Sequence, residues 1–214
     1  MHLNERQLED HMKKQKLYNR TALSILFAVE ILLFISPLGY LRFGILNITT
    51  LHIPVLIAAL SLGVKAGIYV GLLFGCISIW NATFFPNLTS FVFSPFIEVG
   101  GIHGNAYSLI IALIPRILMG VTCACSFQLL SKYRPKLRIL LASAIGTITH
   151  TFLVLFLIYL FFAPAYESAI QIPSNTLLIS FTSIFFTNGI AEIILACIVC
   201  LYTYPLLKHI KKRI

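Results

Sequence analysis

Three charged residues lie inside long apolar stretches, and they are the residues of this chain most suited to binding a polar ligand: Glu30, Arg116 and Glu192. Charged side chains inside hydrocarbon are costly to bury, and they usually pair with one another or mark a substrate or ion pathway. Arg116 follows Pro115, and a proline lacks the backbone N–H that would bond a carbonyl one turn earlier. Two interpretations stay open. Arg116 either forms an ion pair with Glu30 or Glu192, or it presents a guanidinium to an anionic ligand such as a carboxylate.

Neutral polar residues extend this candidate site. His150 falls near the middle of its predicted helix, where it is either a ligand-binding residue or a packing residue. Asn188 lies one helical turn outward of Glu192. Asn81 and the segment Asn87 to Ser94 form either a polar lid or an ordinary solvated loop. We expect five of these groups to converge on one cavity open to the outside: Glu30, Arg116, Glu192, His150 and Asn188. The candidate substrate-binding residues are Arg116, His150, Asn188, Asn81 and Glu192.

The composition places these residues in a membrane protein. Of the 214 residues, 58% are hydrophobic and 11% are charged, and the mean hydropathy is +0.92. Soluble domains carry roughly 25% charged residues. The net charge of +9 does not indicate nucleic-acid binding, because all Lys and Arg residues except Arg42 lie outside the loops predicted to face the exterior. That distribution follows the positive-inside rule.

The hydrophobic pattern predicts an all-α integral membrane protein with a six-transmembrane-helix bundle and both termini cytoplasmic. A cytoplasmic segment at 1–20 precedes a membrane domain at 21–206, and a basic cytoplasmic tail at 207–214 follows it. The first span is not interpreted as a cleaved signal peptide, because a turn at Pro37 follows it instead of a small-x-small cleavage site. The predicted spans are 21–36, 49–62, 64–83, 106–130, 139–162 and 176–205.

Glycines recur every fourth residue at the start of the third span: Gly63, Gly67, Gly71 and Gly75. This spacing keeps them on one slowly drifting helix face. In lipid, small residues let two helices approach closely, so that van der Waals contact stabilises the pair. We expect this face to pack inside the bundle, with a dimer interface as the alternative.

Motifs for catalysis and for nucleotide binding are absent from the sequence. It contains no HExxH, no GxSxG, no acidic metal cluster and no Walker A pattern. The five cysteines all fall in apolar stretches, where we interpret them as small hydrophobic packing residues. We therefore expect neither an enzyme nor a metal protein, and no cofactor in this chain. Without a Walker A pattern, we expect that any energy the protein needs comes from a source other than its own ATP hydrolysis.

Three segments carry a resemblance to a known family: LHIPVLIAALSLGVKAGIYVGLLFG (51–75), LIPRILMGV (113–121) and NGIAEIILACIVCLYTYPLLK (188–208). They resemble the S components, the substrate-binding membrane subunits, of energy-coupling factor (ECF) vitamin transporters, and the pantothenate-like branch most closely. The resemblance extends over the chain from Thr21 onward. It implies a six-helix bundle in the bacterial plasma membrane that binds its vitamin near the outer surface.

The resemblance also implies partners. S components deliver their vitamin through a transmembrane scaffold, the T component, which is driven by two ATPase subunits that use the ATP. The scaffold-contact signature of the family, small-xxx-small on the first span, maps onto Ser24 and Ala28, with a serine where alanine is common. Arg116, Asn188 and Glu192 occupy family positions, and His150 followed by threonine fits loosely.

Pantothenate is the expected substrate, because its single carboxylate, two hydroxyls and amide suit one arginine and several neutral groups. Other vitamins (cobalamin, folate or a pyridoxine-like compound) are alternatives within the same class. A proton-coupled secondary transporter that uses Glu30, Glu192 and His150 is an alternative from another transport class, although no internal repeat supports it. A membrane-embedded enzyme is disfavoured by the lack of a catalytic constellation.

Overall fold

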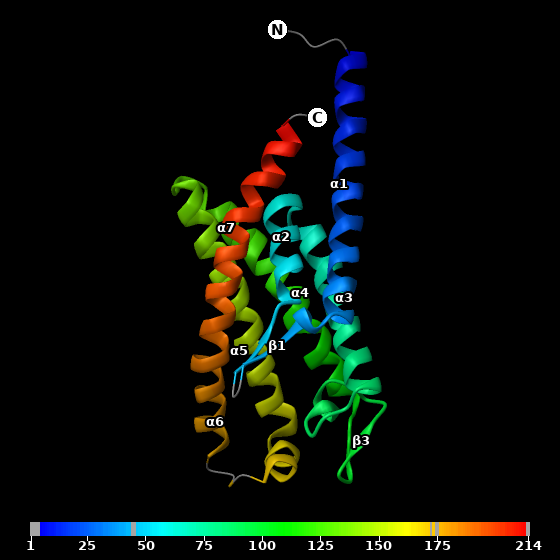
Figure 1. The fold of residues 1–214 in the computed structure, drawn as a ribbon, viewed down its shortest axis with the longest axis vertical. Coiled ribbons are helices and arrows are strands. Elements are labelled where there is room, and N and C mark those ends of the chain that lie inside the picture. The colour runs from blue at the N-terminus through cyan, green and yellow to red at the C-terminus, as the bar shows by residue number, and fades with distance from the viewer. Residues whose placement is uncertain (1–4, 44–45, 172, 174–175, 213–214) are drawn as a thin grey trace.

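The computed structural model describes residues 5–43, 46–171, 173 and 176–212, and it is a bundle of apolar helices with both ends of the chain on the same side (Figure 1). In the described residues, five helical segments are long and apolar enough to cross a membrane. Helices α6 and α7 form one of these segments, joined by the π-helical turn η4. The helices are α1 (Glu5–Ile35), α2 (His52–Leu62), α3 (Val64–Phe84), α4 (Ala106–Leu129), α5 (Pro135–Ile170), α6 (Leu177–Ile184), η4 (Phe185–Gly189) and α7 (Ile190–Lys212).

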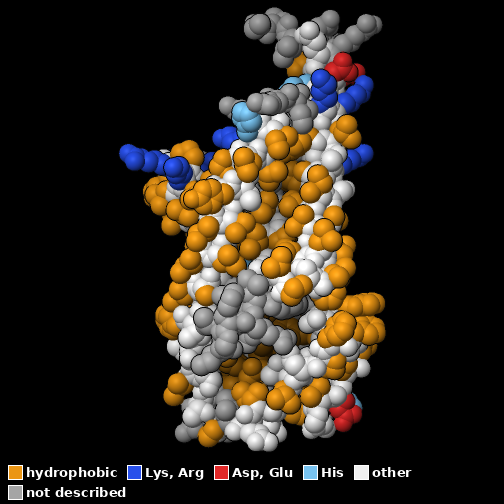
Figure 2. Space-filling view, in the orientation of Figure 1, with side chains coloured by type: hydrophobic (Ala, Val, Ile, Leu, Met, Phe, Trp, Pro, Cys, Tyr) orange, Lys and Arg blue, Asp and Glu red, His pale blue; other side chains and the backbone are white. Residues whose placement is uncertain are grey.

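Lys and Arg side chains gather at the end that carries the two termini, and none is visible at the opposite end in this view (Figure 2). By the positive-inside rule this is the cytoplasmic end. Helix α1 passes the predicted boundary at residue 20 without a break and extends beyond the other helices at this end (Figure 1). The polar N-terminal segment is therefore helical from Glu5 onward.

The second predicted span, 49–62, requires a correction. Only His52–Leu62 is helical, and these 11 residues reach about 16 Å, which is well short of the roughly 30 Å hydrocarbon core. The helix is short because Thr49 still belongs to a strand and because Gly63, at φ +93°, turns the chain directly into α3. Helix α2 is an internal helix, and most of its side chains are buried.

The chain before α2 also differs from the outer loop that the sequence predicts at 38–48. It forms an antiparallel hairpin of β1 (Tyr40–Phe43) and β2 (Leu46–Thr49), in which Tyr40 pairs with Thr49. This hairpin lies at mid-height of the bundle, beside α7 (Figure 1). The short elements are the 3-10 turns η1 (Pro37–Gly39), η2 (Ser90–Val92) and η3 (Leu130–Lys132), and the strands β3 (Glu98–Val99) and β4 (Ile102–His103).

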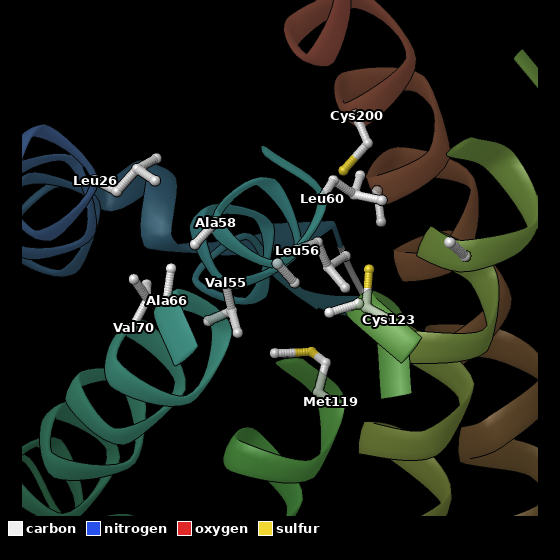
Figure 3. Close-up of a cluster of buried hydrophobic side chains, with 14 of the residues drawn as sticks. Leu26, Val55, Leu56, Ala58, Leu60, Ala66, Val70, Met119, Cys123 and Cys200 are labelled. Atoms are coloured by element: carbon white, nitrogen blue, oxygen red, sulfur yellow. The ribbon is translucent and has the colours of Figure 1, made fainter. Parts of the chain in front are cut away.

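The cytoplasmic half of the bundle is filled by an apolar core built around α2 (Figure 3). Leu56 and Leu60 of α2 face Cys123 of α4 and Cys200 of α7, and both cysteines are fully buried. Leu26 of α1 reaches the same core. These cysteines therefore serve as small hydrophobic side chains in the packing of four helices.

The glycine face of α3 packs against α4 inside the bundle. A Cβ atom at Gly71 would lie 2.5 Å from the backbone oxygen of Arg116, and one at Gly120 would lie 2.5 Å from the backbone oxygen of Gly67. A Cβ atom at Gly75 would lie 2.9 Å from the backbone oxygen of Ala112 of α4. Because α4 covers Gly67, Gly71 and Gly75, these three glycines serve the internal contact and not a dimer interface. Gly63 does not take part in this contact, because a Cβ atom there would meet nothing within 4 Å. The contact brings α3 directly against the turn of α4 that carries Arg116.

Candidate ligand-binding site

A cavity of about 180 Å³ lies in the outer half of the bundle, on the side opposite the termini. Its walls come from α3, α4, α5, the end of β2 and the segment that joins α3 to α4. Most of these side chains are polar, and two aromatic rings lie among them. The cavity is lined by Thr49, Phe74, Ser78, Asn81, Ala82, Asn87, Ser90, Phe93, Arg116 and His150.

Arg116 is positioned by the proline that precedes it. Pro115 cannot donate the backbone hydrogen bond that the carbonyl of Ile111 would otherwise accept. The Arg116 Nη1 atom donates to that same oxygen at 2.6 Å. The freed carbonyl, which the sequence predicts, therefore fixes the direction of the guanidinium on its own helix.

Two aromatic rings flank this guanidinium. The Arg116 Cζ atom lies 5.3 Å from the ring centroid of Phe74 and 5.1 Å from that of Phe93. Both separations fall within the range of cation–π attraction. The Arg116 side chain is buried at 6% exposure, where a charge is screened little by water. A guanidinium carries five N–H donors in a planar fork, a geometry that matches the two oxygens of a carboxylate.

The acidic residues do not form the ion pairs that the sequence allows. Within the part of the chain that the structure describes, neither Glu30 nor Glu192 forms an ion pair with Arg116. Glu30 is completely buried on α1, and neither of its carboxyl oxygens has a hydrogen-bond partner among the described residues. Arg116 is therefore not held in the cavity wall by a carboxylate from α1 or α7.

His150 lines the cavity from α5 and is 7% exposed. Its ring lies 5.7 Å from the ring of Phe74, and neither ring nitrogen makes a hydrogen bond within the described residues. Buried polar atoms nearly always have a partner in folded proteins. The two nitrogens are thus available to a hydroxyl or amide group of a ligand.

Asn81 lies on the cavity-facing side of α3 together with Phe74 and Ser78, at a spacing of three to four residues that places them on one helix face. The segment after α3 covers the cavity and contributes Asn87 and Ser90 to its lining. The predicted lid segment is thus packed from Ser90 to Ser94, whereas Asn87 and Leu88 are exposed.

Two hydrogen bonds and one buried ring hold this lid in place. The hydroxyls of Thr83 and Ser94 are 2.7 Å apart, and Ser108 Oγ donates to the backbone oxygen of Phe91 at 2.7 Å. Phe91 itself is completely buried. The segment is therefore bonded both to α3 and to the first turn of α4.

Glu192 and Asn188 lie outside this lining. The Glu192 Oε1 atom accepts hydrogen bonds from the backbone N–H of Thr49 at 3.0 Å and from its hydroxyl at 2.8 Å. The hydroxyl of Thr151 donates to the other oxygen at 3.5 Å. Glu192 therefore anchors the β1–β2 hairpin, which occupies the space between α7 and the cavity. Asn188 is half-buried in η4, one turn further out.

Several lining residues are missing from the sequence-based set. Phe74 and Ser78 could have been found from their helical spacing with Asn81. Thr49 could not, because its position depends on the hairpin folding inward to Glu192. Phe93 carries no polar signal, and its role becomes visible only from its ring beside Arg116.

Outside the cavity, Ser24 and Ala28 are exposed on α1, on the outer surface of the bundle. Within the described residues, no group of three or more His, Cys, Asp or Glu side chains is placed to hold a metal ion.

Comparison with known proteins identifies the family. Residues 19–204 match the family model described as "ECF transporter, substrate-specific component". The chain is also 35% identical over 199 residues to a protein of Lactococcus lactis subsp. cremoris (strain MG1363) named pantothenic acid transporter PanT, covering 92% of this chain and 96% of that one. Proteins of this family are transporter subunits of bacterial membranes that work with an ECF module. This multi-pass membrane chain belongs to the ECF transporter substrate-specific component family and is not an enzyme.

Proposed function

We propose that this S component captures pantothenate from outside the cell. The observation that carries the proposal is a single buried arginine in a small cavity whose other lining residues are uncharged and mostly polar. Pantothenate has one carboxylate, two hydroxyls and one amide, so its charge and hydrogen-bonding groups match this lining in kind. The relative named pantothenic acid transporter PanT supports the same substrate.

In this proposal the carboxylate of the vitamin binds the guanidinium of Arg116, where planar bidentate hydrogen bonds are strong and directional. The hydroxyls and the amide bind neutral groups around the cavity, among them Asn81, Ser78 and His150. Glu192 acts indirectly: by holding Thr49, it places a hydroxyl-bearing residue at the cavity edge. Asn188 is proposed to position the hairpin from η4, without contact to the vitamin.

The volume of the cavity supports a small ligand. About 180 Å³ is below the roughly 300–1,000 Å³ that is usual for pockets of drug-sized molecules. Cobalamin and folate are much larger than pantothenate and would require the lid or the hairpin to move away. A compact vitamin fits the site with less rearrangement.

We further propose that delivery depends on a T component and two ATPase subunits, and that those subunits use the ATP. The chain has no Walker A pattern of its own. The exposed face of α1 around Ser24 and Ala28 is the proposed contact with the T component, because small residues allow another helix to approach closely.

The decisive experiment identifies the ligand. The protein is purified without added vitamin and denatured, and the released small molecules are measured by mass spectrometry. We expect pantothenate at about one molecule per chain. Titration with panthenol, in which an alcohol replaces the carboxylate, serves as the matched control and should show binding weaker by on the order of 30-fold or more.

Recovery of a different vitamin would reject pantothenate and leave the assignment to the family unchanged. Equal affinity for panthenol and pantothenate would reject Arg116 as the carboxylate-binding residue. An empty protein that shows no thermal shift with any vitamin of a panel would contradict vitamin capture and favour the proton-coupled alternative.

A further inference from the structure

A second cavity, with a volume of about 430 Å³, lies between α1, α2 and α7 at the cytoplasmic end. It has more than twice the volume of the ligand-binding cavity and shares no residue with it. Most of its lining is aliphatic, with Ile25 and Leu26 on α1 and Leu207 and Ile210 on α7. A cavity of this composition suits a hydrocarbon chain and not a carboxylated vitamin.

This second cavity is a groove between the helices, and the residues of α1 that line it show how deep it reaches into the membrane. Lys14, Tyr18, Ala22 and Ile25 recur at three- to four-residue spacing, so one face of α1 lines the groove along its length. The polar N-terminal part of α1 gives way to its apolar span near residue 20. The groove therefore begins at the cytoplasmic membrane surface and continues into the hydrocarbon.

A hydrogen bond connects the two walls. The hydroxyl of Tyr18 on α1 donates to the backbone oxygen of Leu207 on α7 at 3.0 Å. This bond holds the α1 and α7 walls together at the level of the membrane surface. It also places a polar group at the level where a lipid changes from headgroup to acyl chain.

Charge determines which lipid fits. Lys14 lines the groove, and Lys16 and Arg20 of α1, Lys65 of α3 and Lys208 of α7 add positive charge at the same end. The blue side chains in Figure 2 show this concentration. The cytoplasmic leaflet contains anionic lipids, which basic residues at its surface attract. An ammonium group binds a phosphate as a point charge.

We propose that this groove binds one anionic phospholipid, with an acyl chain between α1 and α7 and its phosphate at Lys14. Such a lipid would fill the space between α1, which is mostly exposed, and the rest of the bundle. It would thereby help to hold α1 in place from the cytoplasmic side.

Native mass spectrometry of the detergent-purified protein tests the proposal, with phosphatidylglycerol and phosphatidylcholine added in equal amounts. We expect one bound phosphatidylglycerol and a preference over phosphatidylcholine. Lys14→Gln should weaken this preference about fivefold. Lys16→Gln is the matched control, since Lys16 lies on the same helix but does not line the groove, and it should weaken the preference less than Lys14→Gln does.

Ala22→Phe fills the groove and should abolish binding of both lipids. Pantothenate binding, measured in the same samples, should not change in any variant, because none of these residues lines the other cavity. That measurement also separates a failure of this proposal from a failure of the proposed substrate. Equal binding of the two lipids, an unaffected Lys14→Gln variant, or lipid retained by Ala22→Phe would each overturn the proposal.

Discussion

The α3–α4 pair and helix α1 differ in how firmly they belong to the bundle. In the apolar windows of α3 and α4, 44% and 50% of the residues are buried, against 11% in that of α1. Helices α3 and α4 meet backbone to backbone through Gly67, Gly71 and Gly120. Among the described side chains of α1, only Leu26 and Glu30 are buried. This contrast supports the proposed roles, in which α3 and α4 hold the ligand and the exposed α1 contacts a partner.

The largest expected effect comes from removing the charge in the fixed wall. Arg116→Ala should weaken pantothenate binding by about 2 to 5 kcal/mol, which is on the order of 30- to 3,000-fold in Kd. The physical reason is that the buried carboxylate of the vitamin would lose its charged partner. Isothermal titration calorimetry on the purified variant measures this directly.

Arg138→Ala is the matched control for this substitution. Arg138 also donates to a backbone oxygen, that of Phe127, and stacks over the ring of the same residue, but it does not line the cavity. Arg138→Ala should leave the affinity for pantothenate unchanged. Equal affinity in Arg116→Ala and the unaltered protein would remove the carboxylate-binding role from Arg116.

The convergence of Arg116 and His150 could be predicted from the sequence because each helix fixes the depth of its own residues. Glu30, which is expected in the same cavity, lies outside its lining. The rise per residue places a side chain along a span before any tertiary contact is known. Pro115 likewise predicts, from its missing backbone N–H, that a carbonyl one turn earlier lacks its usual hydrogen bond. Five of the six predicted spans were recovered for the same reason: their length and hydrophobicity are local properties.

The β1–β2 hairpin and the supporting role of Glu192 could not be predicted from local sequence properties. Residues 40–49 offer only Gly44 as a turn signal, and nothing in this stretch indicates that Glu192 of α7 accepts hydrogen bonds from Thr49. That contact joins residues far apart in the sequence. It explains why Glu192 supports the cavity instead of lining it and why α2 starts at His52.

The second prediction concerns the packing of the wall. Gly71→Ala would place a methyl group 2.5 Å from the backbone oxygen of Arg116, so α3 and α4 would have to separate. We expect a loss of about 1 to 3 kcal/mol in stability, together with weaker pantothenate binding. A thermal unfolding assay with and without the vitamin measures both effects.

Gly189→Ala provides the comparison, because a methyl group there would meet Thr151 Cγ2 at 3.4 Å, an ordinary contact distance. Alanine also favours a helix over glycine by roughly 1 kcal/mol. Gly189→Ala should therefore be neutral or stabilising. If both variants lose stability equally, the close approach of α3 to α4 is not what fixes the wall.

The third prediction concerns the exposed face of α1, the proposed contact with the ECF module. Ala28→Trp or Ser24→Trp should lower vitamin uptake in cells by about tenfold and leave the Kd of the purified protein unchanged. Both residues are exposed on the bundle surface, so a bulky ring obstructs a partner helix without disturbing the cavity. Val29→Trp is the control, since Val29 is also exposed but points about 100° away from Ala28. Full uptake in the first two variants would place the contact with the ECF module elsewhere.

The smallest effect is expected at Glu30, the buried charge-bearing residue of α1. Its carboxyl oxygens make no hydrogen bond within the described residues, so the amide of Glu30→Gln breaks no contact and has nearly the same shape. Stability should change by less than about 0.5 kcal/mol, and both binding and uptake should stay near their original values. Loss of uptake with intact binding would show that the carboxyl group acts in the transport cycle, as proton coupling through Glu30 requires. Because Glu30 lies outside the ligand-binding cavity, that result would mean that α1 takes part in transport beyond its surface contact.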